Sequence, residues 1–283
     1  MNWWEWARAQ RALQHWVRVL IGPRPYHIHF VPGGGSFVCF ATQELVVDPT
    51  LVTQWGGPAL LPQRWRGQRV TDVAALAWRV SRTVARHEAG HILFTDPYPI
   101  LGSLHAWLTN ALEDERMERL TGRAAPPARA DFVTLARMLA QHLPWPDPTT
   151  RPATAVLLHA CLQHRWDRQR PAGTPSRLCF ASADDAAVWT DQIAPIVERA
   201  WMAPTAQVVA DEAATILRLL GLPEDASQEG RGLPSFDRLP SPTTRQPEDG
   251  PLAALSVTAL RAAEATAAPA HDDHPDDNPD DHA

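Results

Sequence analysis

The stretch His87-Glu88-Ala89-Gly90-His91 decides the fold of the chain around it. Apolar residues precede it at three- and four-residue intervals: Val73, Leu76, Val80 and Val84. The histidines continue this series, so the spacing predicts a helix from about 71 to 95 with both imidazoles on its core-facing stripe. Side chains four residues apart lie one above the other on a helix, so both can bind one ion.

The same stretch matches the His-Glu-x-x-His pattern, in which two histidines bind zinc and the glutamate acts as a base. Glu88 lies one position round the helix, where it can reach a water beside the metal without binding the metal itself. Gly90 leaves room for another element to approach closely. The alternative is a buried histidine pair satisfied by hydrogen bonds alone.

The composition excludes several classes of function. The net charge of −6 is concentrated in residues 271–283, which hold six Asp and no Arg, so the rest of the chain is close to neutral. A neutral body without a basic block argues against a nucleic-acid-binding surface. No apolar run approaches the roughly 20 residues of a membrane span, and the start of the chain lacks an apolar signal core. We therefore expect a cytoplasmic protein with no membrane span.

The three cysteines, Cys39, Cys161 and Cys179, are widely spaced and form no Cys-x-x-Cys pair. This spacing favours free thiols over a disulfide framework or a thiolate zinc site.

Before the motif helix, the pattern predicts a helix at 2–20 and strands at 26–31 and 36–47, with Gly33-Gly34-Gly35 as a hairpin turn between the strands. Thr71, as the capping hydroxyl, and Asp72, as a carboxylate in the first turn, form a plausible start for the motif helix. After it, the pattern is helical, at 103–120 (Ser103 as N-cap), 130–143, 152–169, 184–201 and 204–220. The expected fold class is α+β and mostly helical, with a small N-terminal sheet on the motif helix and a helical C-terminal half.

A useful zinc site needs a third protein ligand. No histidine stands six residues after His91, so a carboxylate from the helix at 103–120 is the expected solution. Glu113 lies in the middle of that helix's second apolar face and is the favoured ligand, because a buried carboxylate requires a partner. Asp114 is the alternative, either as the ligand or as a residue that orients a ligand histidine. The expected surface charges on this helix are Glu115, Glu118 and Arg119.

The segments 87–96 and 110–116, the latter with the pattern Asn-x-x-Glu-Asp-x-Arg, resemble the glutamate-type zincin metallopeptidases. The closest resemblance is to bacterial and phage members fused to, or encoded beside, von Willebrand A modules and AAA+ ATPases. It covers about 26–120 and implies a zincin fold that binds Zn²⁺, with the third ligand on the helix after the motif. The pattern makes Asn110 a further candidate near the metal. It also suggests an AAA+ or von Willebrand A type protein as a regulatory partner.

The resemblance implies a zincin-like metallopeptidase core at 1–122, and the helical pattern beyond it predicts a helical subdomain at 123–221. Composition predicts a flexible linker at 222–250, a short helix at 251–267 and a disordered acidic tail at 268–283.

These observations predict a zinc metallopeptidase that hydrolyses a specific protein substrate and is gated by a partner. Glu88 would move the proton from water to the leaving amine. The candidate donors to the oxyanion are His105, Tyr98 and Arg116. Two alternatives remain: a non-proteolytic zinc-binding interaction module on a zincin scaffold, and a helical structural protein whose motif is accidental.

Overall fold

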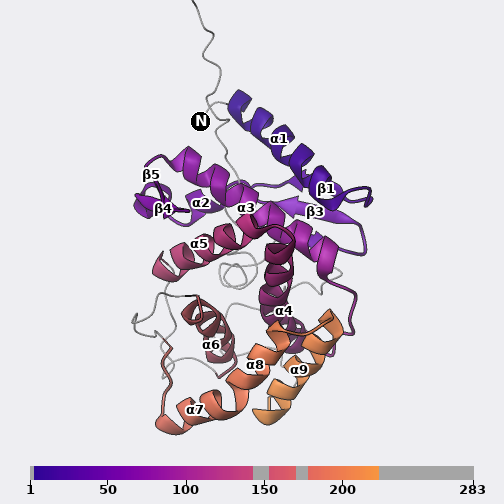
Figure 1. Cartoon of the computed structure of the whole chain (residues 1–283), viewed down its shortest axis with the longest axis vertical. Helices are drawn as coiled ribbons and strands as arrows, with labels where there is room; N and C mark the ends of the chain where they lie inside the picture. The colour runs from indigo at the N-terminus through magenta and orange to yellow at the C-terminus, as the bar shows by residue number, and fades with distance from the viewer. Residues whose placement is uncertain (1–2, 143–152, 170–177, 223–283) are drawn as a thin grey trace, which may run out of the picture.

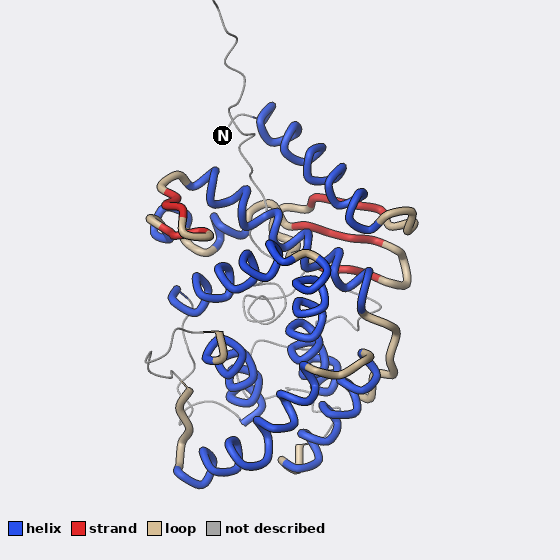
Figure 2. The backbone as a smooth tube through the Cα atoms, in the orientation of Figure 1, coloured by secondary structure: helices blue, strands red, loops and turns tan. Residues whose placement is uncertain are grey.

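The computed structural model of the chain describes residues 3–142, 153–169 and 178–222. Within these ranges the protein is α+β and mostly helical, with a small N-terminal sheet followed by helices, as the sequence predicts (Figure 1, Figure 2). The short helix expected at 251–267, the acidic tail at 268–283 and all but the first residue of the linker at 222–250 lie outside the described residues. Within the described ranges, no helix is both long enough and apolar enough to cross a membrane.

The N-terminal elements are α1 (Trp3–Ile21), β1 (His27–Phe30), β2 (Phe37–Cys39), β3 (Glu44–Val47), α2 (Leu51–Gln54), the 3₁₀ turn η1 (Gly57–Leu60), β4 (Gln63–Trp65) and β5 (Gln68–Val70). Two long helices follow, α3 (Val73–Phe94) and α4 (Ser103–Ala124). The remaining elements are α5 (Pro126–His142), α6 (Ala153–Asp167), α7 (Ala183–Val188), the π-helical turn η2 (Trp189–Ile193), α8 (Ala194–Trp201) and α9 (Ala206–Leu219). The motif helix expected at 71–95 is thus confirmed as α3.

The sheet differs from the predicted hairpin. Its spatial order is β1-β3-β2, with β1 parallel and β2 antiparallel to β3. The hairpin predicted across the glycine triplet is wrong, because β3 lies between the two strands that the triplet connects. The strand predicted at 36–47 is in fact two strands, β2 and β3. Gly33 and Gly35 instead bind the buried carboxylate of Asp48, to which each donates its backbone N–H at 3.0 Å. Their φ angles of 76° and 70° are ones that glycine adopts without strain.

Two apolar clusters lie on different faces of α3 and explain why its middle is buried. On one face α3 packs with α1 and the three-stranded sheet, in a cluster that includes Val17, Leu45 and Ala89. On another it packs with α2, the β4–β5 hairpin and α5, in a cluster that includes Val80 and Leu135. Helix α5, which follows Gly122, therefore shares an apolar core with the motif helix α3.

Helix α4 is the central element of the molecule, with α3, α5, α6, α8 and α9 packed around it (Figure 1). Nearly every residue from Leu104 to Glu118 is buried, whichever side of the helix it occupies. A further apolar cluster joins α4 to α6, α8 and α9. Helical packing is thus continuous across the boundary that the sequence suggested at 122–123.

The helix predicted at 184–201 is interrupted. It consists of α7, the π-helical turn η2 and α8, with Pro195 in the first turn of α8. Proline has no N–H to donate and its ring clashes with the preceding turn, and a π-helical turn is one way for a helix to accommodate this.

Candidate metal centre

Two histidines from α3 form the first part of the site. His87 and His91 are one turn apart, are 0% and 4% exposed, and point into the interior as their spacing predicts. Their ring centroids lie 4.8 Å apart with an edge-to-face angle of 73°. The Nε2 atoms of the two rings face each other at 3.1 Å. The prediction that both imidazoles face the core and lie next to each other is thus confirmed.

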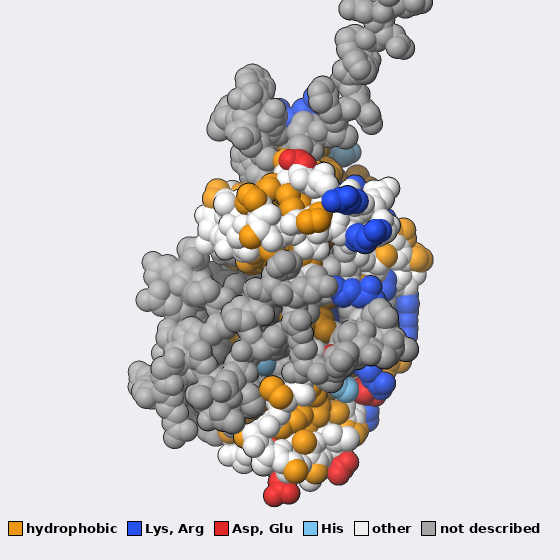
Figure 3. Space-filling view, turned by 90° about the vertical axis from the view of Figure 1, so that its left-hand side faces the viewer, with side chains coloured by type: hydrophobic (Ala, Val, Ile, Leu, Met, Phe, Trp, Pro, Cys, Tyr) orange, Lys and Arg blue, Asp and Glu red, His pale blue; other side chains and the backbone are white. Residues whose placement is uncertain are grey.

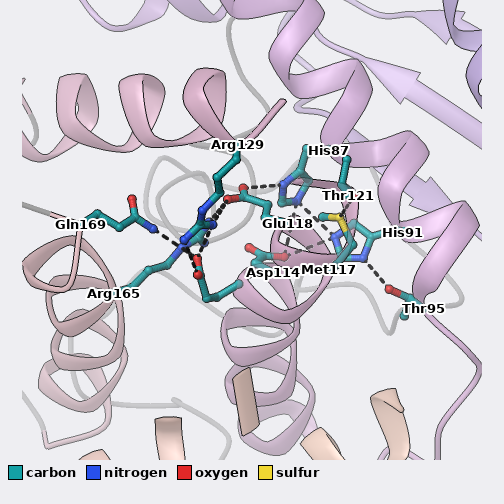
Figure 4. Close-up of polar contacts among 11 residues, drawn as sticks. His87, His91, Thr95, Asp114, Met117, Glu118, Thr121, Arg129, Arg165 and Gln169 are labelled. Atoms are coloured by element: carbon teal, nitrogen blue, oxygen red, sulfur yellow. Dashed lines mark hydrogen bonds and ion pairs between the residues drawn. The ribbon is translucent and has the colours of Figure 1, made fainter. Parts of the chain in front are cut away.

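The third member of the group is Asp114, which comes from α4 and is fully buried. Its Oδ1 lies 3.5 Å from His87 Nε2 and 3.3 Å from His91 Nε2. Figure 4 shows the carboxylate directed at the two rings from the facing helix. This buried group of two imidazoles and one carboxylate can bind a metal ion.

Glu113, the favoured ligand on sequence grounds, is directed elsewhere. Its carboxylate accepts two hydrogen bonds from Arg116, Nε to Oε2 at 2.6 Å and Nη2 to Oε1 at 2.7 Å. It also accepts one from the Thr95 hydroxyl at 2.7 Å. Successive residues leave a helix about 100° apart, so Glu113 and Asp114 cannot both face the histidines. The structure groups Asp114, not Glu113, with the two imidazoles.

Each histidine is held from behind through its Nδ1 atom. A carboxylate can only accept, so the His87 Nδ1–H donates to Glu118 Oε1, at 3.0 Å. The Thr95 hydroxyl gives its hydrogen to Glu113, so its oxygen accepts from the His91 Nδ1–H at 2.9 Å. With Nδ1–H bonded in this way, the neutral form of each ring has its lone pair on Nε2, facing Asp114, which is the tautomer that metal binding requires.

The electrostatics of the group favour a positive charge at its centre. Burial alone would lower the pKa of the His87 imidazole, but the negative charges of Asp114 and Glu118 overcome this and raise it to about 9. Burial likewise would raise the pKa of Asp114, yet the two histidines hold it well below its usual value. Three electron-pair donors that converge in a buried place attract a cation, whether a proton or a metal ion.

Two acidic residues expected on the surface are buried beside the site. Glu115 and Glu118 are 3% and 0% exposed, so the prediction of ordinary surface charges is wrong for both. Glu118 accepts from Arg165 of α6, and Arg129 of α5 lies 2.6 Å from Glu115. Burial would raise the pKa of Glu118, but the Arg165 guanidinium and His87 lower it. The missed signal was spacing, since Glu118 is four residues after Asp114 and therefore on the same side of α4.

Gly90 allows α3 and α4 to approach closely at this point, as expected from the sequence. A Cβ atom at Gly90 would lie 2.2 Å from Met117 Sδ and 2.7 Å from Thr121 Oγ1, both on α4. No side chain at position 90 fits unless Met117 and Thr121 move. The glycine therefore sets the distance between the helix with the histidines and the helix with Asp114.

The remaining candidate site residues lie at different distances from the two histidines. Glu88 is fully buried on α3, next to His87. His105 is nine residues before Asp114 on α4, about 14 Å along the helix axis. Its ring nitrogens contact the backbone, Nδ1 the Leu101 N–H at 3.3 Å and Nε2 the Ala210 carbonyl at 2.9 Å. The structure does not bring His105 to the metal centre.

Arg116 and Tyr98 differ in their availability as oxyanion donors. Arg116 is buried and directs its guanidinium at Glu113, the Phe94 carbonyl and the Pro204 carbonyl, so it clamps α4 to its surroundings. Burial raises the pKa of the Tyr98 hydroxyl well above its usual value, and the nearby charges of Glu113 and Asp114 raise it further. Tyr98 therefore remains a protonated donor close to the site. Asn110 is partly exposed, one turn before Asp114.

Comparison with known proteins identifies no relative: no protein-family profile, no curated protein sequence and no solved structure matches the chain.

Proposed function

We propose that this protein is a zinc-dependent peptidase in which His87, His91 and Asp114 hold the metal ion and Glu88 is the general base. The observation that carries the proposal is the set of distances among the three ligand atoms, 3.1, 3.3 and 3.5 Å. A tetrahedral zinc site with bonds of about 2.0–2.1 Å has edges of about 3.3–3.4 Å between its ligand atoms. Three protein ligands also leave the fourth position for water or substrate, as in catalytic zinc sites.

The residues around the site have separate tasks in this mechanism. A bound zinc ion would polarise the scissile carbonyl and acidify water. Glu88 takes the proton of the attacking water and passes it to the leaving amine. Tyr98, whose hydroxyl stays protonated near the charge of Asp114, is the candidate to donate to the carbonyl oxygen. Glu118 and Thr95 fix the ring orientations of His87 and His91.

The sequence resemblance supports the same reading, because the zincin-like motifs supply the two histidines, the base and the acidic pair at 113–114. Under this proposal Asp114 takes the ligand position for which Glu113 was favoured. The resemblance also makes a partner of the AAA+ or von Willebrand A type a proposal for this chain.

A second function is favoured by one observation, the burial of the ligands. His87 and Asp114 are both 0% exposed, and a structural metal ion needs no access for water or substrate. The chain would then be a zinc-binding interaction module without proteolysis. Glu88 counts against it, since a structural site has no use for a base beside the metal.

Metal analysis and turnover together test the two functions. The purified full chain should contain about one zinc per molecule, lost in His87→Ala and His91→Ala. Stoichiometric zinc in the double histidine variant would contradict the proposed site. A zinc-loaded chain that cleaves no protein in a survey of candidate substrates and partners would favour the interaction module.

A further inference from the structure

Arg165 is a buried charged residue that the sequence motifs leave unexplained. It lies on α6, in the helical half, and its side chain is 1% exposed. Its Nη2 donates to Glu118 Oε2, and its Nε lies 2.8 Å from Glu115 Oε2. A buried guanidinium is costly unless its partners compensate, so this pair of carboxylates accounts for its position.

The two oxygens of Glu118 are divided between two partners. Oε1 accepts from His87 Nδ1, and Oε2 accepts from Arg165. Figure 4 shows the resulting chain of contacts from Arg165 through Glu118 to His87 and on to Asp114. With Oε2 held by α6, the carboxylate can present only Oε1 to the histidine.

A competing partner for Glu118 is close by. Arg129 Nη1 lies 3.9 Å from Glu118 Oε2, while Arg129 is mainly bonded to Glu115, at 2.6 Å. Without Arg165, we expect Glu118 to turn towards Arg129 and to move Oε1 away from His87. The orientation of a ligand histidine therefore depends on a residue of α6.

We propose that Arg165 is a positioning residue of the metal centre, which acts through Glu118 to hold His87 in the orientation that binds the ion. The inference rests on the proposed zinc site and extends it, because it makes the helical half part of the metal centre. Residues after Gly122 then contribute more than a surface for partners.

Zinc affinity of the full-length chain, measured by competition with a chromophoric chelator, tests the role. Removal of a residue that orients a metal ligand typically weakens metal affinity by about 10–100-fold. We expect a loss of this size in Arg165→Met and in Glu118→Gln. The double variant should bind zinc as Glu118→Gln does, because Arg165 acts through Glu118.

Arg168→Met is the matched control. Arg168 lies just past the end of α6 and is 61% exposed, and its guanidinium contacts Glu198 at 2.5 Å, away from the metal centre. The zinc affinity of Arg168→Met should equal that of the wild type. A second readout is the low-field Nδ1–H proton signal of His87 in the zinc-loaded protein, which should shift in Arg165→Met and stay in place in Arg168→Met.

The outcomes separate this inference from the proposed function. A wild-type chain that binds no zinc refutes the zinc site itself. If the wild type binds zinc, unchanged affinity in Arg165→Met overturns the role of Arg165. Losses that add in the double variant overturn it as well, since they would indicate general destabilisation. If Arg165→Met does not fold, unchanged affinity in folded Arg165→Gln, whose neutral amide cannot form the ion pair with Glu118, overturns it equally.

Discussion

Asp114 and Glu113 are adjacent on α4 but face different partners, so their substitution should have different consequences. Asp114→Ala removes the carboxylate beside both histidines and should reduce bound zinc to a small fraction of the wild-type content. Glu113→Ala leaves the three ligand atoms in place and should retain most of the zinc, with a weaker hold on Thr95. Metal analysis after dialysis against a weak chelator checks this. A reversed ranking would move the third ligand to Glu113.

Glu88 should be separable from metal binding. Glu88→Gln preserves shape and removes the base, so the variant should keep about one zinc per chain and a wild-type melting temperature. The same variant should lose cleavage of any identified substrate by a factor of at least about 10², the size typical of a general base. Loss of zinc in Glu88→Gln would instead identify Glu88 as a ligand.

The sequence predicted one half of the site better than the other, for a physical reason. His87 and His91 continue a clear apolar stripe, so periodicity alone oriented them. Helix α4 has no such stripe, because it is packed on all sides and buries residues around its whole circumference. A helical wheel therefore could not decide between Glu113 and Asp114, and it misplaced Glu118. Only the position of α3 and α6 relative to α4 determines which carboxylate faces the histidines.

At the scale of elements, the spacing between α3 and α4 depends on Gly90. Gly90→Ala places a methyl group against Met117 and Thr121, both of which are buried or nearly so. Overpacking of this kind typically costs about 1–3 kcal/mol, so a lower melting temperature is expected. Since the helices carry different ligands, zinc affinity should fall as well. Ala89→Gly, on the same helix, is the control, because it removes a methyl group instead of adding one. It should also lose stability, but its zinc affinity should stay close to that of the wild type.

The helices could be predicted from local sequence, whereas the order of the strands could not. Helices follow from a period of 3.6 and from caps, and α3 begins where expected, although Asp72 rather than Thr71 caps it by accepting from the Ala75 N–H. Strand order is not local. The glycine triplet was assigned to a hairpin, but its N–H groups bind Asp48 and β3 inserts between its flanking strands. The Pro195 signal was present in the sequence and its effect on the helix was missed.

On the scale of the whole molecule, metal removal should destabilise both halves together, because α4 packs against α3 as well as α6, α8 and α9. An ion that binds only the folded state stabilises it by about 4 kcal/mol when free metal exceeds the Kd by 1,000-fold. For a body of this size a chelator should therefore lower the melting temperature by about 10 °C, in one transition. Calorimetry with and without chelator measures the shift. His87→Ala should not respond to chelator, and a second, unshifted transition would show that the halves unfold independently.

The burial of the ligands bears on activity itself. In the peptidase proposed above, a scissile peptide bond would have to touch the metal, yet His87 and Asp114 are fully buried and His91 is 4% exposed. Such cleavage would require the helices around the site to open, and lid or domain motions of this kind are commonly driven by a substrate or partner. We expect the isolated zinc-loaded chain to show little cleavage of casein, and to cleave a specific protein substrate once an activating partner is added. Glu88→Gln should abolish that cleavage without a change in melting temperature. Rapid digestion of casein by the purified chain would show that the site opens without help, and activity that persists in Glu88→Gln would place the catalytic base elsewhere.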